Sequence, residues 1–148
     1  MPLTLAMSEF VTATPKDLGT SDWIPLTPER ARLLEALSRL PAAGPAPIAE
    51  AHEEVDPLAV LAMLPAMLAS IFQFGDASAH RLVALEQCNF LSSVAPNTEI
   101  AMTARILEGQ YNAEGHLVYR LGFFANAKGE SRPFLIGELA AMAGNPPG

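Results

Sequence analysis

Three histidines, one cysteine and a run of acidic residues are the side chains of this 148-residue chain best suited to acid–base or nucleophilic chemistry. Four carboxylates surround His52 in the segment EAHEEVD, residues 50–56. A histidine beside carboxylates can exchange protons near neutral pH. His52 is the one histidine in the loop before a long apolar segment, whereas His80 and His116 adjoin a strand start and a turn and are expected on the surface. Asp56 and His52 are therefore the candidate catalytic residues.

Each of these residues also has a structural interpretation. Asp56 precedes Pro57, and an aspartate followed by a proline is a common start of a helix, so Asp56 is also expected to act as an N-cap. The carboxylates around His52 match no usual metal-ligand spacing, which favours a solvated acidic loop over a metal site. Cys88 lies in a predicted strand and is interpreted as a small buried hydrophobe. No glycine-rich phosphate loop is present, and we expect no metal and no cofactor.

The element that must position Asp56 is the apolar run that follows it. Residues 58–74 read LAVLAMLPAMLASIFQF, and a helix is predicted from Asp56 to near Gly75. Its sides are apolar all round, so other protein should enclose it. Pro65 removes one hydrogen bond of the helix, and a kink is expected there. At 17 residues, the run is at the bottom of the range for a membrane span, and we predict a buried helix instead.

The rest of the chain supplies one more helix and a set of strands. Thr27, Pro28 and Glu29 predict a helix start, and leucines at helical spacing extend that helix to residue 40. Residues 41–55 form a proline-rich loop, and a short strand is expected around Trp23. Short turns separate four predicted long strands, so antiparallel hairpins are expected. These strands cover residues 80–94, 98–107, 116–125 and 132–142.

Composition limits the class of protein. A length of 148 residues fits a single domain over residues 1–148, with an irregular lead-in over 1–19 and a frayed tail over 143–148. The formal charge of −7 disfavours a nucleic-acid-binding role, which needs clustered Lys and Arg. A single cysteine and the absence of a basic, apolar leader at the N-terminus predict a cytoplasmic protein. Half of the residues are apolar, so some apolar surface is expected to meet a second copy of the chain.

One apolar helix followed by about four long strands has few packing solutions. A curved antiparallel sheet wrapped around the helix would bury most of its sides. This is the outline of an α+β hotdog fold.

Several segments resemble a known family of that fold. SDWIPLTPERARLLEAL (21–37) resembles the opening of MaoC-like, NodN-type hotdog dehydratases, and LAVLAMLPAML (58–68) resembles part of their central helix. ALEQCNFLSSVAPNTEI (84–100) is similar to the segment after the helix in both the MaoC-like and the beta-hydroxyacyl-ACP dehydratase families. SRPFLIGELAAM (131–142) resembles the closing strand.

The resemblance implies reversible hydration of the double bond in an acyl thioester of coenzyme A or acyl carrier protein. MaoC-like enzymes usually take an Asp and a His from the segment before the central helix, and a backbone N–H from an Ala-His-Gly at its start. Aligning the proline of that helix with Pro65 places Val55, Asp56 and Pro57 at the Ala-His-Gly positions, and Pro57 has no N–H to donate. The catalytic set is therefore altered.

Three functions follow as hypotheses: an acyl-thioester hydratase or dehydratase with an altered catalytic set, a non-catalytic acyl-binding or partner-stabilising hotdog subunit, and a hotdog thioesterase with Asp56 or Glu54 as base. A homodimer is expected because a small hotdog domain leaves one flank of its helix and one sheet edge uncovered. The candidate residues for lining the acyl tunnel, or the core, are Met63, Met67, Phe72, Phe74 and Phe90.

Overall fold

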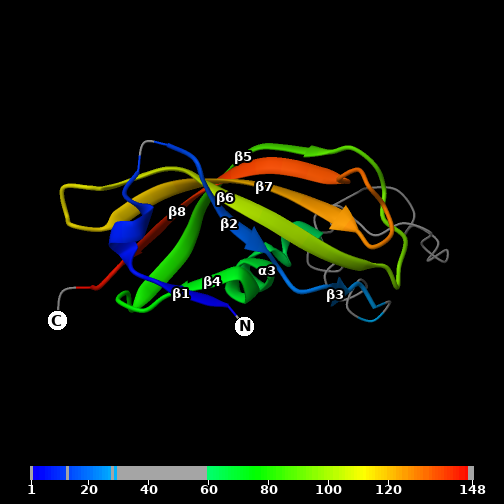
Figure 1. Ribbon diagram of the computed structural model, residues 1–148, viewed down its shortest axis with the longest axis horizontal. Coiled ribbons are helices and arrows are strands. Elements are labelled where there is room, and N and C mark those ends of the chain that lie inside the picture. The colour runs from blue at the N-terminus through cyan, green and yellow to red at the C-terminus, as the bar shows by residue number, and fades with distance from the viewer. Residues whose placement is uncertain (1, 13, 28, 30–59, 147–148) are drawn as a thin grey trace, which may run out of the picture.

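The computed structural model describes residues 2–12, 14–27, 29 and 60–146. Its main feature is a curved, six-stranded antiparallel sheet that wraps around one helix (Figure 1). The strand order is β2-β6-β7-β8-β5, and β3 also pairs with β6. The α+β hotdog architecture expected from the sequence is therefore present. The strands of this sheet are β2 (Lys16–Thr20), β3 (Ile24–Pro25), β5 (Ala79–Phe90), β6 (Glu99–Tyr111), β7 (Leu117–Ala127) and β8 (Leu135–Gly144).

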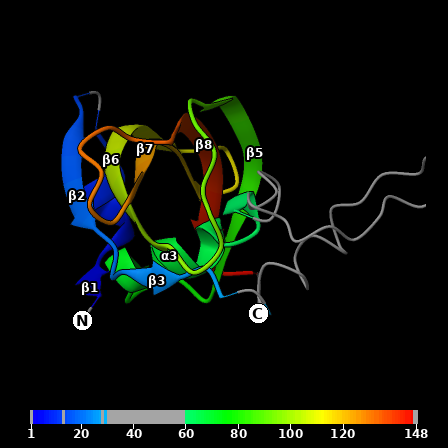
Figure 2. The ribbon, with the colours of Figure 1, turned by 90° about the vertical axis from the view of Figure 1, so that its right-hand side faces the viewer.

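Alternation along the strands decides which face of the sheet meets the helix. In β7, Leu117, Tyr119, Leu121 and Phe123 are buried, whereas the residues between them are exposed or half-buried. A period of two places the first set on one face of the sheet. That face is concave and holds the helix, as the end-on view shows (Figure 2).

The predicted hairpins are present, but one strand takes an unexpected place. β6 pairs with β7 and β7 with β8, each joined by a short turn. β5 instead pairs with β8, so the segment 91–98 carries the chain across to the other side of the sheet. β5 is consequently an edge strand. Two register shifts against β8 bend it, and Gln87 adopts a positive φ of 46° at the second.

The central helix ends earlier than predicted, and its predicted start lies outside the described residues. α3 comprises Leu64–Ile71, and a turn at 62–63 separates it from the helical residues 60–61. The helical run is thus interrupted directly before Pro65, which lies in the first turn of α3, where a backbone N–H has no helical partner. The helix also ends before Gly75: its last turn passes directly into β4 (Phe72–Phe74).

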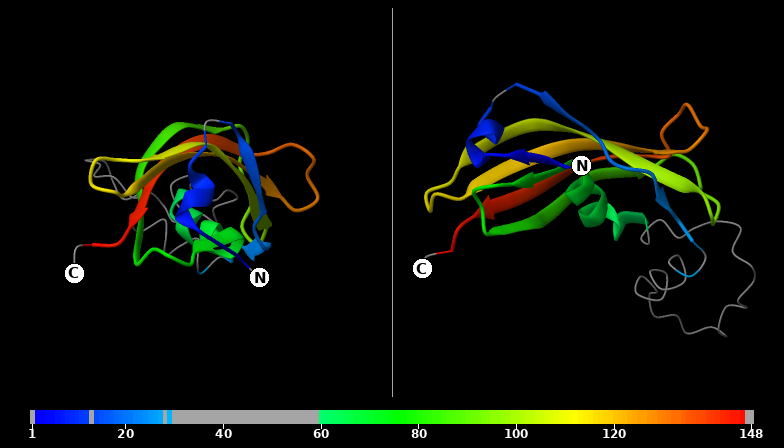
Figure 3. Two further views of the ribbon diagram at one scale, coloured as in Figure 1. Left: turned by 60° about the vertical axis from the view of Figure 1, so that its left-hand side comes forward. Right: turned by 60° about the horizontal axis from the view of Figure 1, so that its bottom comes forward.

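The lead-in, expected to be irregular, is structured. β1 (Leu3–Leu5) pairs in parallel with β4, and the short 3-10 helix η1 (Met7–Phe10) follows it. Both views of Figure 3 show this N-terminal segment beside α3 at one end of the sheet. The pairing with β1 explains why the chain leaves the helix at Phe72, since an extended segment can use the backbone groups of β1.

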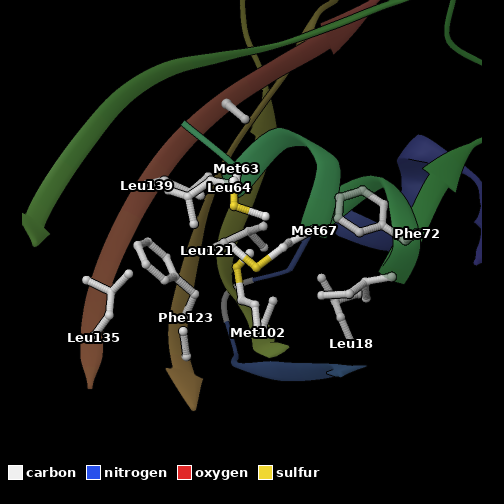
Figure 4. Packing of buried hydrophobic residues seen from close by; sticks show 14 of the residues in the cluster. Leu18, Met63, Leu64, Met67, Phe72, Met102, Leu121, Phe123, Leu135 and Leu139 are labelled. Carbon is white, nitrogen blue, oxygen red and sulfur yellow. The ribbon is translucent and has the colours of Figure 1, made fainter. Parts of the chain in front are cut away.

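The core fills the space between α3 and the concave face. The described residues of one chain do not enclose the helix: Leu64, Met67 and Ile71 are buried, whereas Ala66 and Ala69 are exposed. Figure 4 shows the buried face of α3 packed against side chains of the sheet. The fully buried members of this core include Leu64, Met67, Met102, Leu121 and Leu139.

Some predicted elements lie outside the described residues: most of the helix 27–40, the loop 41–55 and the start of the central helix. Within the described residues, no helix combines the length and the apolar character that a membrane crossing requires.

Candidate functional site

The predicted site residues fall into two groups. Asp56 and His52 lie outside the residues that the structure describes. Met63, Met67 and Phe72 are buried in the core. Phe74 and Phe90 are half-buried and pack against it.

A cleft of about 360 Å³ runs along one side of α3, from Leu64 and Pro65 at its start to Phe72 just after its end. The helix forms one wall, and β4 with the start of β5 forms another. Of the five predicted lining residues, Phe72 and Phe74 lie at this cleft. The volume is at the lower end of the range for small-molecule sites. Its lining is mostly apolar and consists of Leu64, Pro65, Leu68, Ala69, Phe72, Gln73, Phe74, Ala77, Ser78, Ala79, His80, Arg81, Leu82, Tyr119 and Ala141.

One polar pair stands out in this lining. Nε2 of His80 is hydrogen-bonded to the hydroxyl of Tyr119. Tyr119 comes from the concave face of β7 and is 1% exposed. His80 comes from the edge strand β5 and is partly exposed, while its ring packs against those of Phe72 and Phe74. The hydrogen bond therefore links the interior of the protein to the rim of the cleft.

Aromatic rings surround the pair. The ring of Phe74 lies 4.9 Å from that of His80 and 6.0 Å from that of Tyr119, both in edge-to-face arrangements. Phe10 packs on Tyr119 at 4.9 Å, and Phe72 lies 5.8 Å from His80. Rings from η1 and β4 thus fix the orientation of the His80 and Tyr119 side chains.

Burial shifts the pKa values of both side chains in the direction that favours the uncharged form. It lowers the pKa of His80 below its usual value of 6.5 and raises the pKa of the Tyr119 hydroxyl. At neutral pH, the cleft therefore presents an uncharged imidazole and an uncharged phenol. Such a pair can donate or accept hydrogen bonds without bringing a net charge into an apolar site.

The expected surface position of His80 is confirmed, because the residue is exposed, but its bond to Tyr119 was not predicted. The sequence predicted the strand that holds Tyr119 without assigning that residue to a face of the sheet. The contact itself depends on β5 lying beside β8 rather than beside β6, and no local signal revealed that order.

His116, also expected on the surface, is half-buried, and its Nδ1 makes no hydrogen bond with a described residue. A Glu114 carboxylate oxygen lies 3.6 Å from that nitrogen.

Other reactive groups lie away from the cleft. Burial raises the pKa of the half-buried Cys88 thiol, which disfavours the nucleophilic thiolate. On the convex face of the sheet, the Arg120 guanidinium contacts the carboxylates of Glu86, Glu108 and Glu138 at 3.0, 3.3 and 2.6 Å. These ion pairs connect β5, β6, β7 and β8 and stabilise the sheet. No group of three or more His, Cys, Asp or Glu among the described residues is placed to hold a metal ion.

Comparison with known proteins supports the fold. No protein-family model matches the chain, and no curated protein matches its sequence. Three solved structures are similar to it. They are a monoamine oxidase regulatory protein from Archaeoglobus fulgidus (TM-score 0.67, 13% identity, 97% of each chain covered), the R-hydratase PhaJ1 from Pseudomonas aeruginosa (0.62, 13%, 97% of this chain and 88% of that one) and a MaoC-like dehydratase from Rhodospirillum rubrum (0.67, 10%, 97% and 99%). At these identities the likeness shows a shared fold.

Proposed function

We propose that this protein is an acyl-thioester hydratase or dehydratase of the MaoC-like type with an altered catalytic set. The hotdog architecture carries the proposal, because the similar structures include a protein described as an R-hydratase and one described as a MaoC-like dehydratase. The substrate would be a thioester of coenzyme A or acyl carrier protein, in a cytoplasmic setting. A fold alone does not assign a reaction, so the assignment also depends on the residues of the site.

Asp56 and His52 are the proposed acid and base. Addition of water across the double bond needs one group to activate water and another to exchange a proton at the carbon beside the carbonyl. Both residues precede the helix that packs against the concave face of the sheet. The donor for the thioester oxygen cannot come from the backbone of Pro57 and must come from elsewhere.

The cleft beside α3 supports an acyl ligand. Its walls are formed mainly by leucine, alanine and phenylalanine side chains, which favour a hydrocarbon chain over a polar solute.

The second candidate function is a non-catalytic hotdog subunit that binds an acyl group or stabilises an active partner. Val55, Asp56 and Pro57 favour it, because they replace the Ala-His-Gly to which the resemblance points. A thioesterase, with Asp56 or Glu54 as base, is the third.

A homodimer is part of the proposal. β5 is an edge strand of 12 residues, and it exposes the apolar side chains of Leu82, Val83 and Leu85. A long apolar edge is a template for pairing with another strand. The exposed face of α3, with Ala66 and Ala69, is also apolar. A second copy of the chain would cover both surfaces.

Incubation with crotonyl-CoA tests the function. Loss of the enoyl absorbance without release of free thiol indicates hydration, whereas thiol release indicates a thioesterase. We expect hydration that is lost in Asp56→Asn and His52→Gln. An inactive wild-type protein that still binds the thioester would overturn the enzymatic proposal and favour the binding subunit.

A further inference from the structure

The direction of the His80–Tyr119 hydrogen bond can be deduced from the surroundings of Tyr119. The Tyr119 hydroxyl is buried, and its only hydrogen bond among the described residues is to Nε2 of His80. If His80 donated, the phenolic proton would lack an acceptor in an apolar setting, which costs free energy. The hydroxyl therefore donates, and Nε2 accepts.

This direction fixes the tautomer of His80. A neutral imidazole carries one proton, so when Nε2 is the acceptor, that proton lies on Nδ1. Nδ1 has no hydrogen-bond partner among the described residues. His80 thus presents an unpaired N–H donor at the rim of an apolar cleft, held in place by Tyr119 and by the rings of Phe72 and Phe74.

We propose that the cleft binds an apolar small molecule that carries a carbonyl oxygen, and that the His80 Nδ1–H donates a hydrogen bond to that oxygen. The choice of an acyl group as the ligand rests on the proposed function. The hydrogen-bond geometry of His80 and Tyr119 does not depend on whether the protein is an enzyme. It assigns a ligand-positioning role to a histidine outside the Asp56 segment.

The neutral state of the pair favours a carbonyl over an anion. An uncharged imidazole offers a dipole rather than a full charge, which suits a neutral oxygen in an apolar site. Arg81 also lines the cleft and forms no ion pair with a described residue. A carboxylate is therefore the competing ligand that the experiment must separate.

The tautomer is tested by NMR of the histidine side-chain nitrogens in the full chain, which has three histidines. His80→Phe identifies the signals of His80. We expect the pattern of a neutral ring protonated at Nδ1, and a mixture of tautomers in Tyr119→Phe. A ring protonated at Nε2 in the wild-type protein would overturn the inference.

Binding is tested by titration with methyl hexyl ketone, with octanoate as the anionic probe. The double variant His80→Phe/Tyr119→Phe removes both hydrogen-bonding partners and keeps the rings, so the fold should tolerate it. We expect the ketone to perturb the Nδ1 signal of His80 and to bind roughly three- to tenfold more weakly to the double variant, the factor that one hydrogen bond supplies. Equal ketone binding by both proteins, no saturable ketone binding, or tighter binding of octanoate than of the ketone would overturn it.

Turnover is measured separately with crotonyl-CoA. Ketone binding without turnover would refute the enzymatic function and leave the cleft assignment standing. Turnover unaffected by the double variant, together with unchanged ketone binding, would refute the cleft assignment alone.

Discussion

At the residue scale, the two proposed roles of Asp56 make different demands on its side chain. A cap needs an oxygen that accepts a backbone N–H, which asparagine supplies as well as aspartate. Proton transfer needs the carboxylate itself. Conservative and non-conservative variants of this residue therefore separate stability from chemistry.

We predict that Asp56→Asn leaves the melting temperature nearly unchanged, whereas Asp56→Ala lowers stability by about 0.5–2 kcal/mol through loss of the cap. If Asp56 is the base, Asp56→Asn should also reduce turnover by about a hundredfold or more. Thermal unfolding and the crotonyl-CoA assay measure the two effects. Full turnover in a stable Asp56→Asn protein would show that the residue is only a cap.

The His80–Tyr119 pair predicts a pH-dependent stability. Because the pKa of His80 is lowered in the folded state, the unfolded chain binds its proton more readily. The contribution of His80 is therefore complete above the unfolded pKa of 6.5 and is lost as the pH falls through the lower folded pKa. Tyr119, which stays protonated in this range, and the cation Arg81 are the other ionisable groups at the cleft.

The melting temperature of the wild-type protein should consequently fall more between about pH 7.5 and pH 5.5 than that of His80→Phe/Tyr119→Phe. His116→Gln removes a histidine that does not line this cleft and should behave like the wild-type protein. Equal losses in the wild-type protein and the double variant would refute the prediction.

At the element scale, close backbone contact attaches the N-terminal segment to the sheet. Thr12 forms an isolated bridge with Gly109 of β6, and a Cβ atom on Gly109 would lie 2.1 Å from the backbone oxygen of Phe10. That distance is far below a van der Waals contact, and backbone cannot swing aside as a side chain can.

Gly109→Ala should therefore destabilise the protein by about 1–3 kcal/mol. Gly122→Ala is the matched control in the neighbouring strand, where the added Cβ would meet the flexible Leu107 side chain at 3.4 Å. Denaturant unfolding of both variants checks the comparison. Equal stability of the two would mean that the N-terminal segment is not held in this register.

At the scale of the whole molecule, the exposed edge of β5 predicts self-association. The protein should sediment at about twice the 15.7 kDa of one chain. Val83→Lys places a charge on the edge strand, where Val83 is 57% exposed, and should shift the protein toward monomer. Val118→Lys, on the convex face of the central strand β7, should leave the assembly intact. A wild-type monomer at micromolar concentration would exclude the dimer.

The sequence by itself determined the local elements, because each depends on neighbouring residues. The strands predicted over 98–107 and 116–125 are present as β6 and β7, and the short turns after β6 and β7 produced the hairpins that were expected. The apolar character of the central segment identified the helix that packs against the concave face of the sheet.

Tertiary structure decided what depends on distant partners. Phe72–Phe74 leave the helix because β1, nearly seventy residues earlier in the chain, offers backbone hydrogen bonds. His80 can contact Tyr119 because β5 pairs with β8, which lies next to β7. The order of strands in a sheet is not encoded in the residue pattern of any one strand. For this reason, local sequence patterns did not predict the hydrogen bond between His80 of β5 and Tyr119 of β7, although this pair supplies polar groups to the cleft.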